Sequence, residues 1–247
     1  MPRFSDYHRT VIGYHGTRRS IAERIVLRQQ TFTWQDNPGD WMGSGVYFWE
    51  YGPKQAWWWA ELRRRHRKWE EPTAVVASMI RLGFCFDLLD PDNARDLKSF
   101  HDDFVQARAS AGLEPLTNQR RHKYLDKAIF EYAYAAIEQE NDKLGEPARI
   151  DTCRGVYVRP GGRGRLWDSS WVEHDAFIQL LVRNTDCILG SWLVDPIEEA
   201  ENVAEDQPEI DPGRGEDPES GEGIPLDDGP GAAPDYAQGG AADPGAG

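Results

Sequence analysis

The segment DWMGSGVYFWE, residues 40–50, places two glycines immediately before a short aromatic strand. Its last six residues, GVYFWE, have the β-branched and aromatic content that is typical of a strand. Ordinary core packing does not require both Gly43 and Gly45 just before Tyr47. Because glycine has no Cβ, each of them lets the backbone approach a ligand or a facing strand closely. The segment therefore indicates that a ligand or a neighbouring strand fits tightly against this turn and Tyr47.

A second segment, VIGYHGT at residues 11–17, has a related construction. Its apolar residues predict a strand that ends in a histidine, a glycine and a threonine. A short helix is predicted in SIAERIVLRQ, residues 20–29, where serine and glutamate have the spacing of a capping box. The two glycine-containing segments are thus about thirty residues apart, with one helix between them.

Further helices and strands are predicted as far as residue 194. Helical spacing of apolar residues, with proline at the first position of one helix, predicts helices at residues 53–69, 91–112 and 118–143. Apolar and β-branched runs predict strands at residues 73–82, 84–89, 153–158, 176–183 and 187–194. Strands at both ends, with helices early and in the middle, favour an α+β fold with a mixed sheet over alternating βαβ units.

Charge divides the chain into two parts. The 247 residues carry a net charge of −14, but residues 195–247 hold sixteen Asp and Glu against one Arg, which leaves 26 acids and 27 bases before them. The C-terminal stretch is rich in Pro and Gly and poor in large apolar residues, so it cannot bury enough surface to offset its ordering entropy. We expect a globular domain at residues 1–197 and a disordered acidic tail at residues 198–247, a solvating tail being favoured over an interaction arm.

Cysteine use and the N-terminal residues indicate an intracellular protein. Cys85, Cys153 and Cys187 include no close pair, so the sequence contains neither a zinc knuckle nor a redox motif. The first residues lack the apolar region of a signal peptide, and no run approaches the ~18 apolar residues that span a membrane. The expectation is a cytoplasmic chain with no membrane partner.

Three common ligand classes are not indicated by local patterns. The glycines of a dinucleotide fingerprint lie between a strand and a helix, whereas GSGVYF places its glycines before a strand. The six histidines are scattered without the spacing that puts two ligands on one helix face, so no metal site is predicted. The basic stretch ELRRRHRKW, residues 61–69, could contact phosphate, but a solvated helix face is the favoured interpretation.

Three segments together resemble one enzyme family. YHGT (residues 14–17), GSGVYF (43–48) and FIQLLVRNTDCILGSWLV (177–194) are similar to the diphtheria-toxin and poly(ADP-ribose) polymerase branch of the ADP-ribosyltransferases. In that branch the first strand carries His-Gly-Ser/Thr, the second Gly-x-Gly-Ile/Val-Tyr-Phe, and the third a Glu-Tyr-Ile-Val-Tyr type of sequence. The resemblance spans about residues 10–194 and implies a split mixed β-sheet core with flanking helices.

The resemblance implies NAD as co-substrate and gives roles to named residues. His15 is expected to hold the ribose next to nicotinamide, the Gly16 backbone to grip the carboxamide, and Thr17 to brace that turn. Tyr47 is expected to stack on the nicotinamide ring, and Gly45 to allow the close approach that a flat ring needs. These five residues form the expected cofactor-binding set.

The third segment departs from the family pattern. It has Gln179 where the polymerases have a catalytic glutamate, so the expected catalytic set is His15, Tyr47 and Gln179. An amide can hydrogen-bond a ribose hydroxyl but supplies no negative charge, which argues against polymer elongation and leaves single transfer open. Carboxylates of other segments that could supply the missing charge are Glu50, Glu173 and Asp175.

The expected activity is mono-ADP-ribosyl transfer, with cleavage of the nicotinamide glycosidic bond of NAD and transfer to a macromolecular acceptor, protein or nucleic acid. Small stand-alone transferases of the families it resembles often act as toxins or phage-conflict effectors, which implies a neutralising partner. Two alternatives stay open at this point. One is an NAD glycohydrolase, in which water replaces the acceptor, and the other is a module that binds NAD or ADP-ribose without turnover.

Overall fold

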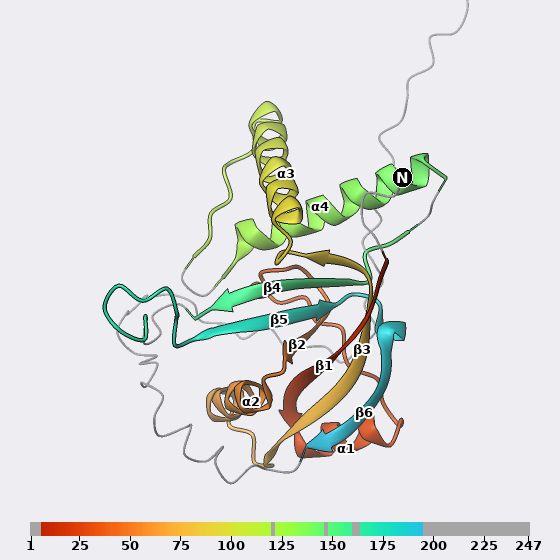
Figure 1. The fold of residues 1–247 in the computed structure, drawn as a ribbon, viewed down its shortest axis with the longest axis vertical. Coiled ribbons are helices and arrows are strands. Elements are labelled where there is room, and N and C mark those ends of the chain that lie inside the picture. Colours follow the sequence, from red (N-terminus) through yellow and green to blue (C-terminus); the bar gives the residue numbers. More distant parts are fainter. Residues whose placement is uncertain (1–5, 120–121, 146–147, 160–163, 195–247) are drawn as a thin grey trace, which may run out of the picture. The chain divides into compact units, whose positions relative to one another are not determined.

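A computed structural model describes residues 6–119, 122–145, 148–159 and 164–194 (Figure 1). The elements, in chain order, are β1 (Asp6–Arg18), α1 (Arg19–Val26), β2 (Val46–Glu50), α2 (Pro53–Arg67), β3 (Thr73–Asp87), α3 (Pro91–Ser110), α4 (Tyr124–Lys143), β4 (Thr152–Val158), β5 (Ala176–Val182), the 3-10 turn η1 (Thr185–Cys187) and β6 (Ile188–Val194). The predicted α+β class with a mixed sheet is confirmed. The predicted tail at residues 198–247 lies outside the described residues.

The sheet is organised around the long strand β3, which pairs with β1, β4 and β6. The sheet runs β1-β2-β5-β4-β3-β6, and β1 also pairs with β3, so the pairings lead back to β1. All pairs are antiparallel except β3 with β4. β1 pairs with β3 from Asp6 to Arg18, whereas its ladder with β2 holds two residue pairs. The ladder between β1 and β2 is thus the shortest in the sheet.

The two strands predicted at residues 73–82 and 84–89 are one continuous strand, β3. Gly83 has a φ of +58°, a left-handed conformation that bends the chain without ending the strand. Before this bend β3 pairs with β6, its pairing with β1 reaches Phe84, and after the bend Cys85–Asp87 pair in parallel with β4. The glycine that suggested a turn in the sequence therefore redirects a single strand between the two parts of the sheet.

Two helix starts also differ from the sequence prediction. α1 begins at Arg19 with no side-chain cap, and the Glu23 carboxylate accepts from the Arg19 guanidinium (2.6 Å), so the predicted capping box at Ser20 is wrong. α4 begins at Tyr124 rather than at residue 118. Asn118 instead accepts from backbone N–H groups of the first helical turn at 3.1 Å, which caps the helix from outside it.

The core is divided between the two faces of the sheet. One cluster joins α1 to residues such as Phe48, Val76 and Leu180, and a second joins α3 and α4 to β4, β5 and the end of β3. A third, around Trp49 and Val75, is covered by α2. In Figure 1 the helices α3 and α4 lie beside β4, whereas α1 and α2 lie towards the opposite end of the sheet.

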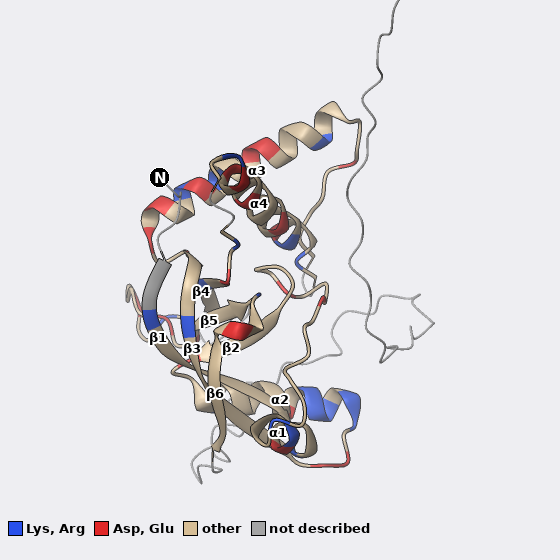
Figure 2. Cartoon of the chain, turned by 90° about the vertical axis from the view of Figure 1, so that its right-hand side faces the viewer, with Lys and Arg blue, Asp and Glu red and all other residues tan. Residues whose placement is uncertain are grey.

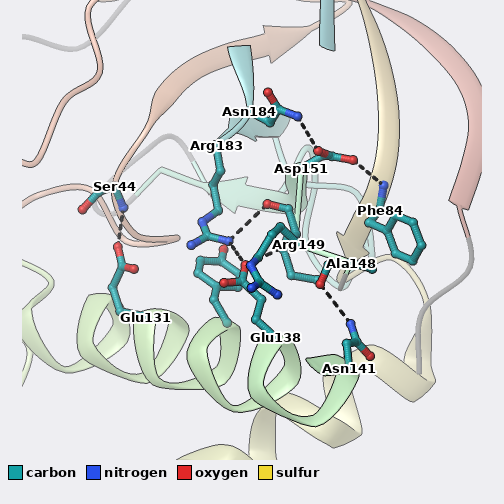
Figure 3. Close-up of polar contacts among 12 residues, drawn as sticks. Ser44, Phe84, Glu131, Glu138, Asn141, Ala148, Arg149, Asp151, Arg183 and Asn184 are labelled. Carbon is teal, nitrogen blue, oxygen red and sulfur yellow. Dashed lines mark hydrogen bonds and ion pairs between the residues drawn. The ribbon is translucent and has the colours of Figure 1, made fainter. Parts of the chain in front are cut away.

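Polar contacts fix α4 to the sheet and to the segment before β2 that contains Gly43 and Gly45 (Figure 3). Arg183, just after β5, reaches Glu138 of α4 at 2.7 Å, and its guanidinium lies 4.2 Å from the centre of the Tyr134 ring. Two turns before Glu138 on the same helix, Glu131 accepts from the Ser44 backbone N–H at 2.7 Å. The helix therefore holds the end of β5 and the segment before β2 in fixed positions.

The described residues include no helix with the length and apolar character that a membrane crossing requires. They also contain no group of three or more His, Cys, Asp or Glu arranged to hold a metal ion. Cys85, Cys153 and Cys187 are all free thiols and all buried.

Candidate functional site

The Tyr47 hydroxyl lies inside a tight turn formed by residues 40–43, here called the 40–43 turn. It donates to the Gly43 carbonyl (2.9 Å) and accepts from the Met42 backbone N–H (2.9 Å). The turn is closed by a hydrogen bond from the Gly43 N–H to the Asp40 carbonyl (3.2 Å). Burial raises the pKa of Tyr47 above its ordinary value, so the phenol stays protonated. Tyr47 is thus fixed by the segment that precedes its own strand.

Gly43 lies within this turn, against Glu131 and Tyr134 of α4, and Gly45 lies against β5. Their φ angles are +97° and +154°, values that residues with a side chain rarely adopt. A Cβ on Gly45 would lie 2.6 Å from Leu181 Cδ1 and 2.7 Å from the Val182 carbonyl oxygen. Of the two neighbours that the sequence allows, a facing strand and a ligand, the facing strand is confirmed for Gly45.

His15 lies where the pairing between β1 and β2 ends. Tyr14 pairs with Trp49, and no further pair of these strands follows it among the described residues. Instead, His15 Nδ1 lies 2.8 Å from the Tyr47 carbonyl oxygen, an acceptor that a continued ladder would have used. A carbonyl oxygen only accepts, so Nδ1 carries the hydrogen and Nε2 of the neutral ring is an acceptor.

The surroundings of His15 keep its imidazole neutral. The Phe32 and Phe48 rings lie at centroid distances of 5.4 and 5.7 Å, at steep angles to the imidazole. Burial lowers the pKa of His15 from 6.5 to about 4, the hydrogen bond to the Tyr47 carbonyl opposes this, and the positive charge of Arg63 lowers it further. A neutral imidazole with an accepting Nε2 has the property that the expected ribose-binding role requires.

Gly16 and Thr17 lie near the end of β1, which continues one residue beyond them to Arg18. This part of β1 keeps its pairing with β3, with Gly16 opposite Val75. Gly16 also lies directly against α2, since an added Cβ would be 2.0 Å from the Ala56 carbonyl oxygen. Thr17 is buried and belongs to a strand rather than to a turn.

Gln179 shares one face of the sheet with Tyr47. In the β2–β5 ladder Tyr47 pairs with Leu181 and Trp49 pairs with Gln179, and side chains of paired or alternate residues point to the same side. Gln179 is 8% exposed. The register therefore brings the second and third predicted catalytic residues to neighbouring positions on one face.

Trp41 fixes the orientation of the Gln179 amide. The indole Nε1 lies 2.6 Å from Gln179 Oε1. Because an indole N–H only donates, the amide oxygen must face Trp41, and Nε2 with its two hydrogens faces away. The indole ring is itself placed by Gly155, where a Cβ would lie 2.9 Å from it, and by an edge contact with Phe130. Sequence analysis missed Trp41, although it lies within the opening segment.

The three predicted catalytic residues are linked in pairs. His15 bonds the backbone of Tyr47, and the 40–43 turn holds both the Tyr47 hydroxyl and, through Trp41, the Gln179 amide. The His15 ring itself leaves β1 on the opposite face from Tyr47 and Gln179, beside Phe48. His15 and Tyr47 consequently lie on opposite faces of the sheet where the β1–β2 ladder ends.

The carboxylates suggested by the sequence are engaged elsewhere. Glu50 forms a two-pronged ion pair with Arg154 at 2.5 and 2.8 Å, and its side chain is 2% exposed. Arg154 also contacts Asp87 at 3.1 Å, so this buried charge cluster ties β2, β3 and β4 together. Glu173 lies 3.8 Å from Arg165, and Asp175 is buried at 2% exposure in the segment before β5.

A polar chain that the sequence did not reveal joins α2 to the 40–43 turn. Arg63 donates to Gln35 Oε1 at 3.3 Å, and Asn37 Nδ2 donates to the same oxygen at 3.0 Å. Asn37 in turn donates to the Asp40 carboxylate from its backbone and its side chain, at 2.8 and 3.0 Å. Burial raises the pKa of Asp40 and lowers the pKa of Arg63.

The basic stretch of α2 therefore has two parts. Arg63 is partly buried and belongs to the polar chain just described. Arg65, Arg67 and Lys68 are exposed, which agrees with the solvated face expected from the sequence. Figure 2 shows the Lys and Arg residues gathered at the far end of α2.

Comparisons of the chain with family models, with curated proteins and with solved structures found no significant match.

Proposed function

We propose that this chain is a mono-ADP-ribosyltransferase that cleaves NAD between nicotinamide and ribose and transfers ADP-ribose to a macromolecular acceptor. The proposal includes an ADP-ribosyltransferase-like fold, with NAD bent across the split between β1 and β2. It is supported by the three motif segments, which come from β1, β2 and β5 and lie on neighbouring strands.

One observation carries the proposal. The β1–β2 ladder stops after Tyr14, and the next β1 residue, His15, donates from its ring to the Tyr47 carbonyl at 2.8 Å. Simple packing of two antiparallel strands favours continuing the ladder, because each lost pair leaves backbone groups to satisfy. A neutral histidine and a fixed tyrosine at the edge of an opened ladder are suited to receive a ligand there.

The residues present fit the expected roles in NAD binding. His15 Nε2 is free of the Tyr47 contact and, as an acceptor, matches a ribose hydroxyl. Tyr47 offers an aromatic ring whose hydroxyl is already occupied, so the ring face is the part available for stacking. Gln179 Nε2 points away from Trp41 as a donor, which suits a ribose oxygen.

The reaction requires little covalent chemistry from the protein. The bond between ribose C1′ and the nicotinamide nitrogen breaks, and its electron pair leaves with nicotinamide. The acceptor then donates an electron pair to C1′ and loses its proton to water. The contribution of the site is to orient the ribose and stabilise the positive charge that develops on it.

Gln179 favours one competing function, a module that binds NAD or ADP-ribose without turnover. Its amide carries no charge, and Glu50, one of the substitutes predicted from the sequence, is held by Arg154. A fold can retain its ligand after losing its chemistry. The two functions differ in one product, free nicotinamide.

The deciding experiment incubates the full chain with NAD labelled in the adenine, with and without a cell lysate. Transfer predicts release of nicotinamide together with label on material that sediments, and sensitivity to protease or nuclease then identifies the acceptor class. Release of nicotinamide with all label in free ADP-ribose identifies a glycohydrolase. Saturable NAD binding without nicotinamide release identifies a binding module and contradicts the proposal.

A further inference from the structure

Asp40 is a partly buried carboxylic acid at the start of the 40–43 turn. Its Oδ2 accepts both hydrogen bonds from Asn37, at 2.8 and 3.0 Å. Because both bonds go to one oxygen, Oδ1 is not used by them. The loop thus orients the group through one oxygen, and among the described residues no side chain or backbone group is shown bonded to the other.

The position of Asp40 relates it to the three predicted catalytic residues. The turn it begins holds the Tyr47 hydroxyl through Met42 and Gly43, and the next residue, Trp41, holds the Gln179 amide. On the other side, Asn37 and Gln35 connect it to Arg63, whose charge acts on His15. Asp40 is therefore the carboxyl group most directly connected to both sides of the site among the described residues.

Three other carboxyl groups are less suited to supply a negative charge at the site, because each is held by a partner of its own. Glu50 is held by Arg154, and Glu131 accepts from Ser44. Asp36, in the same loop as Asp40, is paired with Lys127 and Ser44. We propose that Asp40 supplies the negative charge that Gln179 lacks, an inference that rests on the proposed transferase function.

In this assignment the ionised Asp40 carboxylate stabilises the positive charge on the ribose as the bond to nicotinamide breaks. No proton moves in that step, since the electron pair of the broken bond leaves with nicotinamide. Trp41 and Gln179 orient the ribose, and Asp40 supplies the charge. The two functions that a single glutamate combines in the polymerases are here divided between two residues.

A pH profile reports on the assignment. The groups that face Asp40 are Arg63 of α2, Lys127 of α4 and Tyr47 of β2. Burial raises the pKa of Asp40 despite its bonds to Asn37 and the two cations. Only the ionised form acts, so nicotinamide release falls as pH falls through this pKa. Protonation of His15, whose pKa is about 4, also lowers release at acid pH. The Asp40→Asn variant has no carboxyl group at position 40, so it shows the His15 effect alone.

The test compares Asp40→Asn with the wild type for nicotinamide release, NAD affinity and thermal unfolding. Asparagine keeps the size of the side chain and an oxygen that accepts from Asn37, so the turn is retained. Release is expected to fall about 100-fold with NAD affinity preserved, and the acid limb that remains belongs to His15. Asp36→Asn is the matched control, with the same charge change in the same loop, and it should retain release near the wild-type rate.

Two results overturn the inference while leaving the proposed function standing. The first is nicotinamide release by Asp40→Asn at the wild-type rate, and the second is an equal loss in Asp36→Asn, which would trace the effect to the loop. If Asp40→Asn does not fold, the wild type decides the question. A release rate that does not fall at acid pH then excludes Asp40. No release by the wild type under any condition contradicts both the inference and the proposed function.

Discussion

Because His15 is kept neutral in the folded chain, the free energy of unfolding falls at acid pH. Its folded pKa is about 4, against 6.5 for the exposed side chain. Above pH 6.5 neither state binds the proton, so stability is at its full value. As pH falls from 6.5 to 4 the unfolded chain binds a proton that the folded chain excludes, which removes up to about 3 kcal/mol of stability.

Urea unfolding of the wild type and of His15→Gln at several pH values between 7 and 4 checks this prediction. Glutamine does not titrate, so the variant should lose less stability than the wild type across this window. Carboxylates titrate in both proteins and cancel in the difference. Parallel stability curves for the two proteins would show that the folded state does not suppress protonation of His15.

Gln179→Glu distinguishes two roles of the amide. A glutamate oxygen can accept from Trp41 as the amide oxygen does, and the variant adds negative charge where the ribose becomes positive. Nicotinamide release is therefore expected to hold steady or rise. Gln179→Met is the control, because it leaves the Trp41 N–H without its acceptor at a cost of about 1–3 kcal/mol. Reduced release by the Glu variant, with NAD affinity intact, would show that the Nε2 donor is required.

Residues that act through local backbone geometry could be predicted from the sequence, and those that act through distant contacts could not. Gly45, before Tyr47, has the close approach to a facing strand that its position indicated. The bond from Trp41 to Gln179 joins positions 138 residues apart, and no local pattern reports it. The connection of Asp40 to Arg63 likewise depends on how α2 packs against the loop, so it appears only in the folded chain.

At the scale of elements, the contact between β1 and α2 is set by Gly16. An alanine Cβ there would lie 2.0 Å from the Ala56 carbonyl oxygen and 2.8 Å from the Ala60 Cβ, so the helix must move. Gly16→Ala is expected to lower the free energy of unfolding by about 1–3 kcal/mol. It should also impair NAD binding, because the displaced backbone is the part expected to grip the carboxamide.

Gly190→Ala in β6 is the matched control for Gly16→Ala. No atom lies within 4 Å of the Cβ that it adds, so its free energy of unfolding should change by no more than about 0.5 kcal/mol. Denaturant titration of both variants gives the comparison. Equal stability of the two would mean that α2 does not lie against Gly16 in solution.

Periodicity identified most elements, and their boundaries were less predictable. α2 and α3 begin at the prolines that mark their first turns, as the sequence indicated. β3 was divided in two by the prediction because a glycine usually ends a strand, whereas Gly83 bends this one between two partners. The start of α4 was placed too early because Asn118 is a capping side chain outside the helix.

At the scale of the whole molecule, the acidic C-terminal residues are expected to be dispensable for NAD cleavage. The last described strand, β6, ends at Val194, which pairs with Val75, and residues 195–247 have few apolar side chains to anchor. A chain ending at Val194 should release nicotinamide at the rate of the full chain. An increase after truncation would instead indicate an inhibitory contact with the basic end of α2, and salt should then weaken that inhibition in the full chain.

The central claim is that His15 and Tyr47, where the β1–β2 ladder ends, support cleavage of NAD. The most direct measurement is the rate of nicotinamide release by the wild type and by His15→Ala and Tyr47→Ala, each with its melting temperature. We predict release by the wild type, loss to background in both variants, and a melting temperature for His15→Ala within a few degrees of the wild type. Tyr47→Ala also loses the bonds to the 40–43 turn, so its melting temperature should fall further. Undiminished release by a folded His15→Ala, or no release by the wild type, would contradict the account.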